Sequence, residues 1–406
     1  MSAIDRRRRS LLLRLLGPLV AASALAAAPA QGPGPQAQAS KLTPPATRLA
    51  VIGYLFPRNT LIDPAGLPAD QLTHVNYAFA NVRDGRVVEG FEHDAENFAI
   101  LAAVRRAHPH LKVLVSVGGW TWSGGFSDAA LTADSRRVFV ASAVAFVRRH
   151  DLDGFDVDWE YPGLRGNGNV HRPEDKENFT ALMAELRTAL DADGASRNRR
   201  LLLTFAAGAS TAFLEHTEMA KVQASVDFVN LMTYDFRVAS VEPVAGHHAN
   251  LFDQPLDDKN RSGDRTVRQF IDAGVPAHKL VLGVPFYGRG WTNVTLAPTT
   301  DGTPGTGLYR PGTALTGRSL SYGRLAAELV DREGFVRIWD AQAQQPYLWN
   351  AATRTVICYD DPESLRVKAR YIRERGLGGA MFWEYGDDPS GALLAALDTG
   401  LRPPRD

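Results

Sequence analysis

The chain has 406 residues, 45 Lys and Arg against 45 Asp and Glu, and a single cysteine. This length and a 45% apolar content suffice for a large core and exclude a disordered or fibrous protein. The formal net charge of zero argues against a nucleic-acid partner, and one cysteine excludes a disulfide framework or a cysteine-rich metal site.

The first thirty residues have the layout of a cleaved export signal. Arginines crowd the start of the chain, and an apolar run from Leu15 to Ala28 ends in small residues around Ala30. This run is too short to span a bilayer comfortably, which argues against the alternative of a retained membrane anchor. We therefore expect residues 1–30 to be a signal, of which a twin-arginine signal is one form. The mature protein is then secreted or periplasmic, without stable membrane association.

Residues 31–47 are rich in Gln, Pro and Ala and are expected to form a disordered linker. From there on, eight short apolar segments alternate with helical patterns. They are rich in Val, Ile, Leu and aromatic residues and are bounded by Gly, Pro, Asp or Ser, as buried parallel strands are. The predicted strands are 49–55, 73–80, 111–117, 153–160, 200–207, 226–234, 279–287 and 378–384.

Two of the intervening helices are clear from their own signals. Apolar residues follow a helical spacing over 179–190, and Asp361 can cap a helix that Pro362 opens. Eight β–α repeats over residues 48–402 predict an α/β fold, a (β/α)8 TIM barrel. A doubly wound sheet is the alternative, but no glycine-rich phosphate turn follows the first strand. In such a barrel, the active site should lie at the carboxyl ends of the strands.

The connection between the seventh strand and the last helix is far longer than an ordinary βα loop. It holds three strand-like segments, 334–339, 346–349 and 354–359, and several aromatic residues that need something to pack on. We interpret residues 291–358 as a small α+β insertion on the rim of the barrel, rather than as a mobile surface loop.

Three acidic residues alternate along the fourth predicted strand. Asp156, Asp158 and Glu160 share one face, while the residues between them are large and apolar and should face the helices. Three carboxylates crowded inside the barrel repel one another, so at least one should hold a proton near neutral pH, as a general acid must. A metal site would require further ligands at other strand ends, where only Asp235 is an obvious candidate. We therefore expect no metal and no other cofactor.

Five separated segments together resemble glycoside hydrolase family 18, the chitinases. The resemblance covers residues 49–395, including the insertion. The matching segments are Asp153-x-x-Asp156-x-Asp158-x-Glu160, Ser116-Val-Gly118-Gly119-Trp120, Met232-Thr-Tyr234-Asp235, Val284-Pro-Phe-Tyr287-Gly-Arg289 and Gly379-Ala-Met-Phe-Trp383-Glu.

The resemblance implies a substrate-assisted mechanism that retains the anomeric configuration. The 2-acetamido oxygen of the substrate would be the nucleophile, and Glu160 the general acid and base. Asp158 would orient the acetamido group, Asp156 would share a proton with Asp158, and Tyr234 would donate its hydroxyl to the acetamido oxygen. Substrate contacts are implied for Tyr54, Phe79, Gly118, Gly119, Trp120, Met232, Asp235, Tyr287, Arg289 and Trp383. Among these, Trp383 would lie beneath the reacting sugar and Trp120 on the leaving-group side.

The segment after Asp235 departs from the family pattern, because residues 236–240 contain neither the Gly nor the Trp found there in many chitinases of this subgroup. Leaving-side binding and exo or endo action therefore stay open. We expect a secreted, monomeric chitinase that cleaves chitin or N-acetylglucosamine oligosaccharides at β-1,4 links. The alternatives are an endo-β-N-acetylglucosaminidase acting on glycoprotein glycans and a non-hydrolytic chitinase-like lectin.

A histidine pair and the single cysteine are predicted to have structural rather than catalytic roles. His247 and His248 lack partner ligands at a recognised spacing, so a hydrogen-bonding role is favoured over a metal site. Cys358 lies within an apolar run and is expected to be a small buried hydrophobe rather than a reactive thiol.

Overall fold

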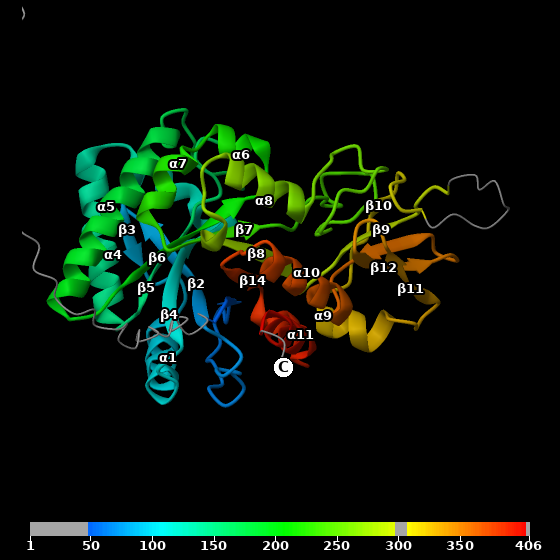
Figure 1. Cartoon of the computed structure of the whole chain (residues 1–406), viewed down its shortest axis with the longest axis horizontal. Coiled ribbons are helices and arrows are strands. Elements are labelled where there is room, and N and C mark those ends of the chain that lie inside the picture. The colour runs from blue at the N-terminus through cyan, green and yellow to red at the C-terminus, as the bar shows by residue number, and fades with distance from the viewer. Residues whose placement is uncertain (1–47, 297–306, 403–406) are drawn as a thin grey trace, which may run out of the picture. The chain divides into compact units, whose positions relative to one another are not determined.

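Eight parallel strands close into a barrel in the computed structural model, which describes residues 48–296 and 307–402 (Figure 1). The expected signal and linker lie outside these residues. The hydrogen-bonded order is β1-β14-β8-β7-β6-β5-β4-β2, and the pairing of β2 with β1 closes the ring. The predicted (β/α)8 barrel is thereby confirmed, with each strand close to its predicted position. The barrel strands are β1 (Ala50–Leu55), β2 (His74–Arg83), β4 (Lys112–Gly118), β5 (Gly154–Asp158), β6 (Leu202–Gly208), β7 (Phe228–Met232), β8 (Leu280–Pro285) and β14 (Gly379–Trp383).

Helices cover the outside of the barrel. The apolar stripe predicted over 179–190 is fully buried in α5, and α10 begins at Pro362 as predicted. The Asp361 carboxylate accepts hydrogen bonds from the backbone N–H groups of Glu363 and Ser364, which satisfies two otherwise unpaired donors. The longer helices are α1 (Asp94–Ala107), α4 (Ala133–Arg149), α5 (Asp175–Ser196), α8 (Gly263–Asp272), α10 (Pro362–Glu374) and α11 (Ala392–Leu401). The shorter ones are α2 (Gly119–Trp122), α3 (Phe126–Ala130), α6 (Thr211–Glu215) and α7 (Met219–Val222).

A second, antiparallel sheet is inserted between β8 and α10 and lies beside the barrel at the right of Figure 1. The three predicted strand segments correspond to β11, β12 and β13, and the sheet also includes β9, whose first residue is Arg289. Trp291, Tyr347, Trp349 and Cys358 are buried in its core, so its aromatic residues do pack as expected. Its elements are β9 (Arg289–Thr292), β10 (Thr313–Ala314), α9 (Tyr322–Arg324), β11 (Phe335–Asp340), β12 (Gln345–Asn350) and β13 (Thr355–Cys358), while the short β3 (Arg86–Val88) pairs with β2.

The strand that carries the acidic residues is shorter than predicted. β5 ends at Asp158, where it still pairs with β4, and Glu160 lies just beyond the ladder, where no neighbouring strand continues to pair with the chain. The side chains between the acids do face the helices, since Trp159 is buried and stacks on Phe126 at 5.4 Å between ring centroids. The difference places Glu160 at the rim of the barrel rather than inside it.

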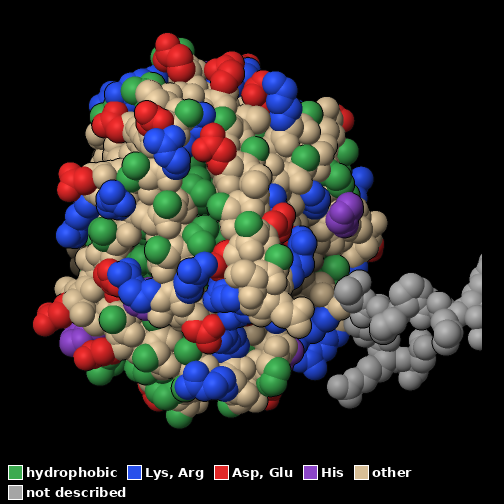
Figure 2. Space-filling view, turned by 90° about the vertical axis from the view of Figure 1, so that its left-hand side faces the viewer, with side chains coloured by type: hydrophobic (Ala, Val, Ile, Leu, Met, Phe, Trp, Pro, Cys, Tyr) green, Lys and Arg blue, Asp and Glu red, His purple; other side chains and the backbone are tan. Residues whose placement is uncertain are grey.

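On the face shown in Figure 2, basic and acidic side chains are interspersed, and neither sign of charge dominates. This distribution agrees with the formal net charge of zero. Within residues 48–296 and 307–402, no helix has the length and apolar content that crossing a membrane requires.

Candidate active site

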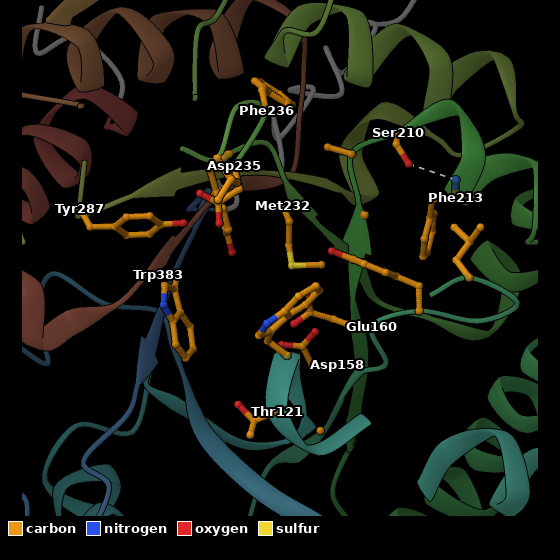
Figure 3. Close-up of a pocket in the computed structure, with 18 of the residues that line it drawn as sticks. Thr121, Asp158, Glu160, Ser210, Phe213, Met232, Asp235, Phe236, Tyr287 and Trp383 are labelled. Atoms are coloured by element: carbon orange, nitrogen blue, oxygen red, sulfur yellow. Dashed lines mark hydrogen bonds between the residues drawn. The ribbon is translucent and has the colours of Figure 1, made fainter. Parts of the chain in front are cut away.

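A cavity of about 1240 Å³ opens at the carboxyl ends of the barrel strands, where the fold predicts the site. Figure 3 shows Asp158 and Glu160 within it, with Trp383 to one side. Most of the predicted site residues are brought together here. Those that line the cavity are Phe79, Gly118, Trp120, Asp158, Glu160, Met232, Tyr234, Asp235, Tyr287, Arg289 and Trp383.

Asp156 lies beneath the cavity, fully buried in a shell of donors. Its carboxylate accepts hydrogen bonds from the Tyr54 hydroxyl at 2.9 Å, the Ser116 hydroxyl at 2.8 Å and the Asn230 amide at 3.2 Å, and another from the Thr204 hydroxyl. Burial raises the pKa of Asp156, while these hydrogen bonds act against that rise. Four converging donors favour the ionised form of this group.

Asp158 and Glu160 both have raised pKa values. Burial, followed by the nearby charges of Glu160 and Asp156, raises the pKa of Asp158 well above its usual range. Burial raises the pKa of Glu160 to about 7; a hydrogen bond with Tyr161 acts against this rise, and the charge of Asp235 adds to it. The Oδ1 atom of Asp158 is buried without a hydrogen-bond partner among the described residues. Asp158 and Glu160 can therefore each hold a proton at a pH where ordinary carboxyl groups have lost theirs.

The backbone around Asp158 and Glu160 is held by one serine and by close packing at a glycine. The Ser123 hydroxyl accepts a hydrogen bond from the backbone N–H of Glu160 at 2.8 Å and lies 3.1 Å from the carbonyl oxygen of Asp158. Gly118 has a φ of +107°, and a Cβ atom at this position would lie 2.4 Å from the same carbonyl oxygen. Only glycine fits here, so the strand ends that carry the acids approach each other closely.

Asp235 is ionised and held in place. Arg289 donates two hydrogen bonds to its carboxylate, from Nε at 2.8 Å and Nη2 at 2.7 Å, and Nδ1 of the buried His248 lies 3.5 Å away. Burial alone would raise the pKa of Asp235, but the interactions with His248 and Arg289 outweigh it and hold this pKa below its usual range. His248 thus lies against a carboxylate, but the geometry among the described residues gives its ring nitrogens no hydrogen bond, so the predicted hydrogen-bonding role stays a prediction for this residue.

Aromatic rings form one wall of the cavity. Trp383 stacks against Phe79 with 5.3 Å between ring centroids, and Tyr234 and Tyr287 meet edge to face at 6.3 Å. Trp120 also lines the cavity and is 52% exposed. Half-exposed rings of this kind offer apolar faces on which pyranose rings can stack.

Three predicted site residues do not line the cavity. Tyr54 and Asp156 lie below it, hydrogen-bonded to each other, and Gly119 packs against the ring of Phe79. Sequence reasoning missed Ser123, Thr204 and Asn230 as supports of the acids. For Thr204 and Asn230 the signal was available, because each is a polar residue within an otherwise apolar strand.

The segment that departs from the family pattern is anchored by a buried cation. Arg237 is 1% exposed and forms ion pairs with Asp257 and Asp258. As a result the loop presents Val238 and Val241 to the cavity, without a tryptophan.

His247 and Cys358 have the roles that the sequence predicted, a hydrogen-bonding histidine and a small buried side chain. His247 lies 3.2 Å from Asp340, and Cys358 is fully buried, which raises the pKa of its thiol well above the usual range. No three His, Cys, Asp or Glu side chains in the described part of the chain are grouped so that they could hold a metal ion.

Comparison with known proteins identifies the family. Residues 50–388 match the family model described as glycosyl hydrolases family 18. Chitinase A1 of Niallia circulans is 44% identical over 315 residues, which are 76% of this chain and 45% of that protein. A solved family 18 N-acetylglucosaminidase from Paenibacillus barengoltzii is 41% identical with a TM-score of 0.78, over 87% of this chain and 100% of that one. A mutant class V chitinase of Nicotiana tobaccum, solved in complex with NAG4, is 26% identical with a TM-score of 0.76, over 87% and 99% of the two chains.

A (β/α)8 barrel with a cavity that combines acids of raised pKa and aromatic rings defines the class of glycoside hydrolases. More narrowly, the chain belongs to glycosyl hydrolases family 18. It spans less than half the length of Chitinase A1.

Proposed function

We propose that this enzyme hydrolyses β-1,4-linked N-acetylglucosamine polymers by substrate-assisted, retaining catalysis. The observation that carries the proposal is the state of the carboxyl groups in the cavity. The Asp235 carboxylate accepts hydrogen bonds from Nε and Nη2 of Arg289 and is not free to attack a sugar. Asp158 precedes Glu160 by two residues, so both acids come from the end of the same strand. Asp158 and Asp235 therefore do not supply an opposed, free carboxylate, and the substrate's own acetamido oxygen is the nucleophile in this proposal.

In this mechanism Glu160 donates its proton to the glycosidic oxygen while the acetamido oxygen attacks the anomeric carbon. Its pKa of about 7 keeps a large share of the group protonated near neutral pH. The unpaired oxygen of Asp158 accepts a hydrogen bond from the acetamido N–H group. The Asp158 carboxylate also stabilises the positive charge that develops on the intermediate. Asp156 shares a proton with Asp158, and the Tyr234 hydroxyl donates a hydrogen bond to the acetamido oxygen. Glu160 then removes a proton from the incoming water, and the configuration at the anomeric carbon is retained.

Oligomers that differ only at the 2-position test this proposal. The full chain should cleave N-acetylglucosamine oligomers and leave matched oligomers of glucose or free glucosamine intact, because only the first carries the nucleophile. Proton NMR of the fresh products should show the β-anomer. A Glu160→Gln variant should bind the oligomers and fail to cleave them. Efficient cleavage of the glucose or glucosamine oligomers would refute the mechanism, and binding without cleavage by the unaltered chain would support the lectin.

A second candidate activity is favoured by one comparison. The similarity to the Paenibacillus N-acetylglucosaminidase extends over that whole chain, which points to release of single sugars as the alternative outcome. The products from a hexamer separate the two, since a chitinase yields dimers or longer oligomers early in the reaction and an N-acetylglucosaminidase yields monomers. Hydrolysis of a glycoprotein glycan and not of the hexamer would instead identify the endo-β-N-acetylglucosaminidase.

Export and chain organisation complete the proposal. Residues 1–30 would direct the chain out of the cytoplasm, 31–47 would link the signal to the enzyme, and 291–358 would form the insertion beside the catalytic cavity. Mass spectrometry of the exported protein should give an N-terminus at residue 31. An unprocessed N-terminus in the culture medium would contradict this assignment.

A further inference from the structure

A second cavity, the amino-end cavity, lies at the amino ends of β6, β7 and β8, at the opposite end of the barrel from the catalytic cavity. Arg200, Asp227 and Lys279 come just before these three strands and line it, together with Arg187 of α5. The strands pair side by side, so side chains from separate segments of the chain meet here. The volume of about 300 Å³ far exceeds the roughly 10–15 Å³ that one water molecule requires, so a small ligand fits.

The carboxylate of Asp227 in the amino-end cavity already has several partners. Its Oδ1 atom accepts a hydrogen bond from Arg200, and its Oδ2 atom accepts one from the backbone N–H of Leu203 at 2.9 Å. Nη1 of Arg187 lies 3.3 Å from the same Oδ2 atom, and Arg187 also forms an ion pair with Asp191. Asp227 therefore holds the two guanidinium groups in place and has little capacity left to accept a further donor.

Lys279 is the cation of this cavity that no carboxylate neutralises. Its Nζ atom donates a hydrogen bond to the carbonyl oxygen of Gln223 and forms no ion pair with the described residues. Burial lowers the pKa of Lys279; the charge of Asp227 acts against this, and the charge of Arg200 adds to it. Three cations thus face two aspartates, which leaves one positive charge in excess. A bound anion would relieve the repulsion between Lys279 and Arg200.

The amino-end cavity also offers further hydrogen-bond donors. The Nε atom of Arg187 is buried without a hydrogen-bond partner among the described residues. Ser225 and the exposed His278 line the cavity as well, and both side chains can donate. Hydrogen bonds from charged donors to phosphate oxygens are among the strong ones in proteins. A lining with excess positive charge and several donors therefore suits an oxyanion rather than a cation or a neutral sugar.

We propose that the amino-end cavity binds a phosphate-class oxyanion, either free or as the terminal phosphate of a larger molecule, with Lys279 and Arg200 as the main charged donors. The cavity shares no lining residue with the catalytic cavity. Bound phosphate therefore stabilises the folded chain, because it binds the folded state and not the unfolded one, and leaves sugar cleavage unchanged.

Binding of inorganic phosphate to the full chain tests the site without any sugar substrate. Calorimetry gives the dissociation constant, and Tm is measured as phosphate replaces chloride at pH 7 and constant ionic strength. Lys279→Gln removes the charge but keeps a donor for the Gln223 carbonyl, and it should weaken phosphate binding about tenfold. Lys279→Arg keeps the charge and should restore most of the affinity. Lys259→Gln is the matched control, because Lys259 is exposed and does not line the cavity, and it should bind phosphate like the parent.

A second variant guards against a structural effect of the first. The side chain of Arg200 is 69% exposed, so Arg200→Gln should disturb the fold little and should weaken phosphate binding about threefold. The Tm of each variant in chloride alone shows whether it is folded. Glycerol 3-phosphate separates the two sources of phosphate, since tighter binding than inorganic phosphate assigns the site to a phosphate monoester and weaker binding assigns it to the free ion.

The site is supported if phosphate binds saturably, Lys279→Gln weakens the binding and Lys279→Arg restores it. Equal stabilisation by phosphate and chloride, no saturable binding of either phosphate probe, or equal affinities in the parent and folded Lys279→Gln would overturn it. Sugar cleavage by the parent should be the same with and without saturating phosphate. Because the binding measurements contain no sugar, their failure would leave the proposed function standing, and a failure to cleave chitin oligomers would leave the phosphate site standing.

Discussion

Replacement of Glu160 by glutamine should stabilise the folded protein at alkaline pH while it abolishes hydrolysis. The side chain is 8% exposed, and its pKa rises from 4.5 in a free glutamate to about 7 in the fold. The folded chain therefore holds this proton more tightly than the unfolded chain. The free energy of unfolding must fall as the pH rises between these two values, and glutamine, which does not titrate, removes the fall.

The size of the effect follows from the pKa difference. The rise in the pKa of Glu160 from 4.5 to about 7 lowers the free energy of unfolding by about 3 kcal/mol at pH values above 7. At pH 4 the effect is almost nothing, because Glu160 is protonated in both the folded and the unfolded chain. For about 350 ordered residues, 3 kcal/mol corresponds to an increase in Tm of roughly 4 °C.

The assay is thermal unfolding of the unaltered chain and Glu160→Gln at pH 4, 6 and 8. Glu374→Gln, an exposed position at the end of α10, is the matched control and should change Tm little at any pH. A stabilisation that is equal at pH 4 and pH 8, or that is larger at pH 4, would refute the assigned direction of the pKa shift.

Substitutions at three further positions test the electrostatics and the fold. Asp235→Asn removes a negative charge that raises the pKa of Glu160, so the alkaline limb of the kcat/KM profile should move down by about one pH unit; an upward shift would contradict this coupling. Asp361→Ala removes the cap of α10 and the ion pair with Arg337 and should lower the free energy of unfolding in urea by about 1–2 kcal/mol. Asp361→Asn keeps the cap acceptor and should lose less. Trp159→Ala empties a fully buried site behind β5 and should cost about 3–5 kcal/mol by the same measurement, and a loss below 1 kcal/mol would show that the ring does not support the strand.

Much of the fold was predictable because buried parallel strands and amphipathic helices leave local signals. The apolar stripe of α5 and the Asp361–Pro362 start of α10 are encoded within a few consecutive residues. The end of β5 was less well predicted, because a strand ends where its neighbours stop pairing, and those neighbours are distant in the sequence. The sequence pattern continued through Glu160 while the hydrogen-bonded ladder did not.

The candidate site was predictable only in part for the same reason. Alternation along one segment placed Asp156, Asp158 and Glu160 together, and the family resemblance supplied residues on other strands. No local pattern could show that Ser123 supports Glu160. The contacts between Phe56, Phe91 and Trp122 likewise arise from three separate segments of the chain that meet only in the closed barrel.

The sequence by itself determined the barrel, the zero net charge and the crowding of three acids on one segment, since each depends on composition or on neighbours a few residues apart. The tertiary structure decided which of the acids are held by several hydrogen-bond donors and which are not. Asp156 is surrounded by donors from β1, β4, β6 and β7, and Asp235 is bound by Arg289. Asp158 is buried with one oxygen that has no hydrogen-bond partner among the described residues, and Glu160 is buried with a hydrogen bond to Tyr161. Protonation depends on burial and on charges brought close by folding, so the balance of charge along the chain could not assign these roles.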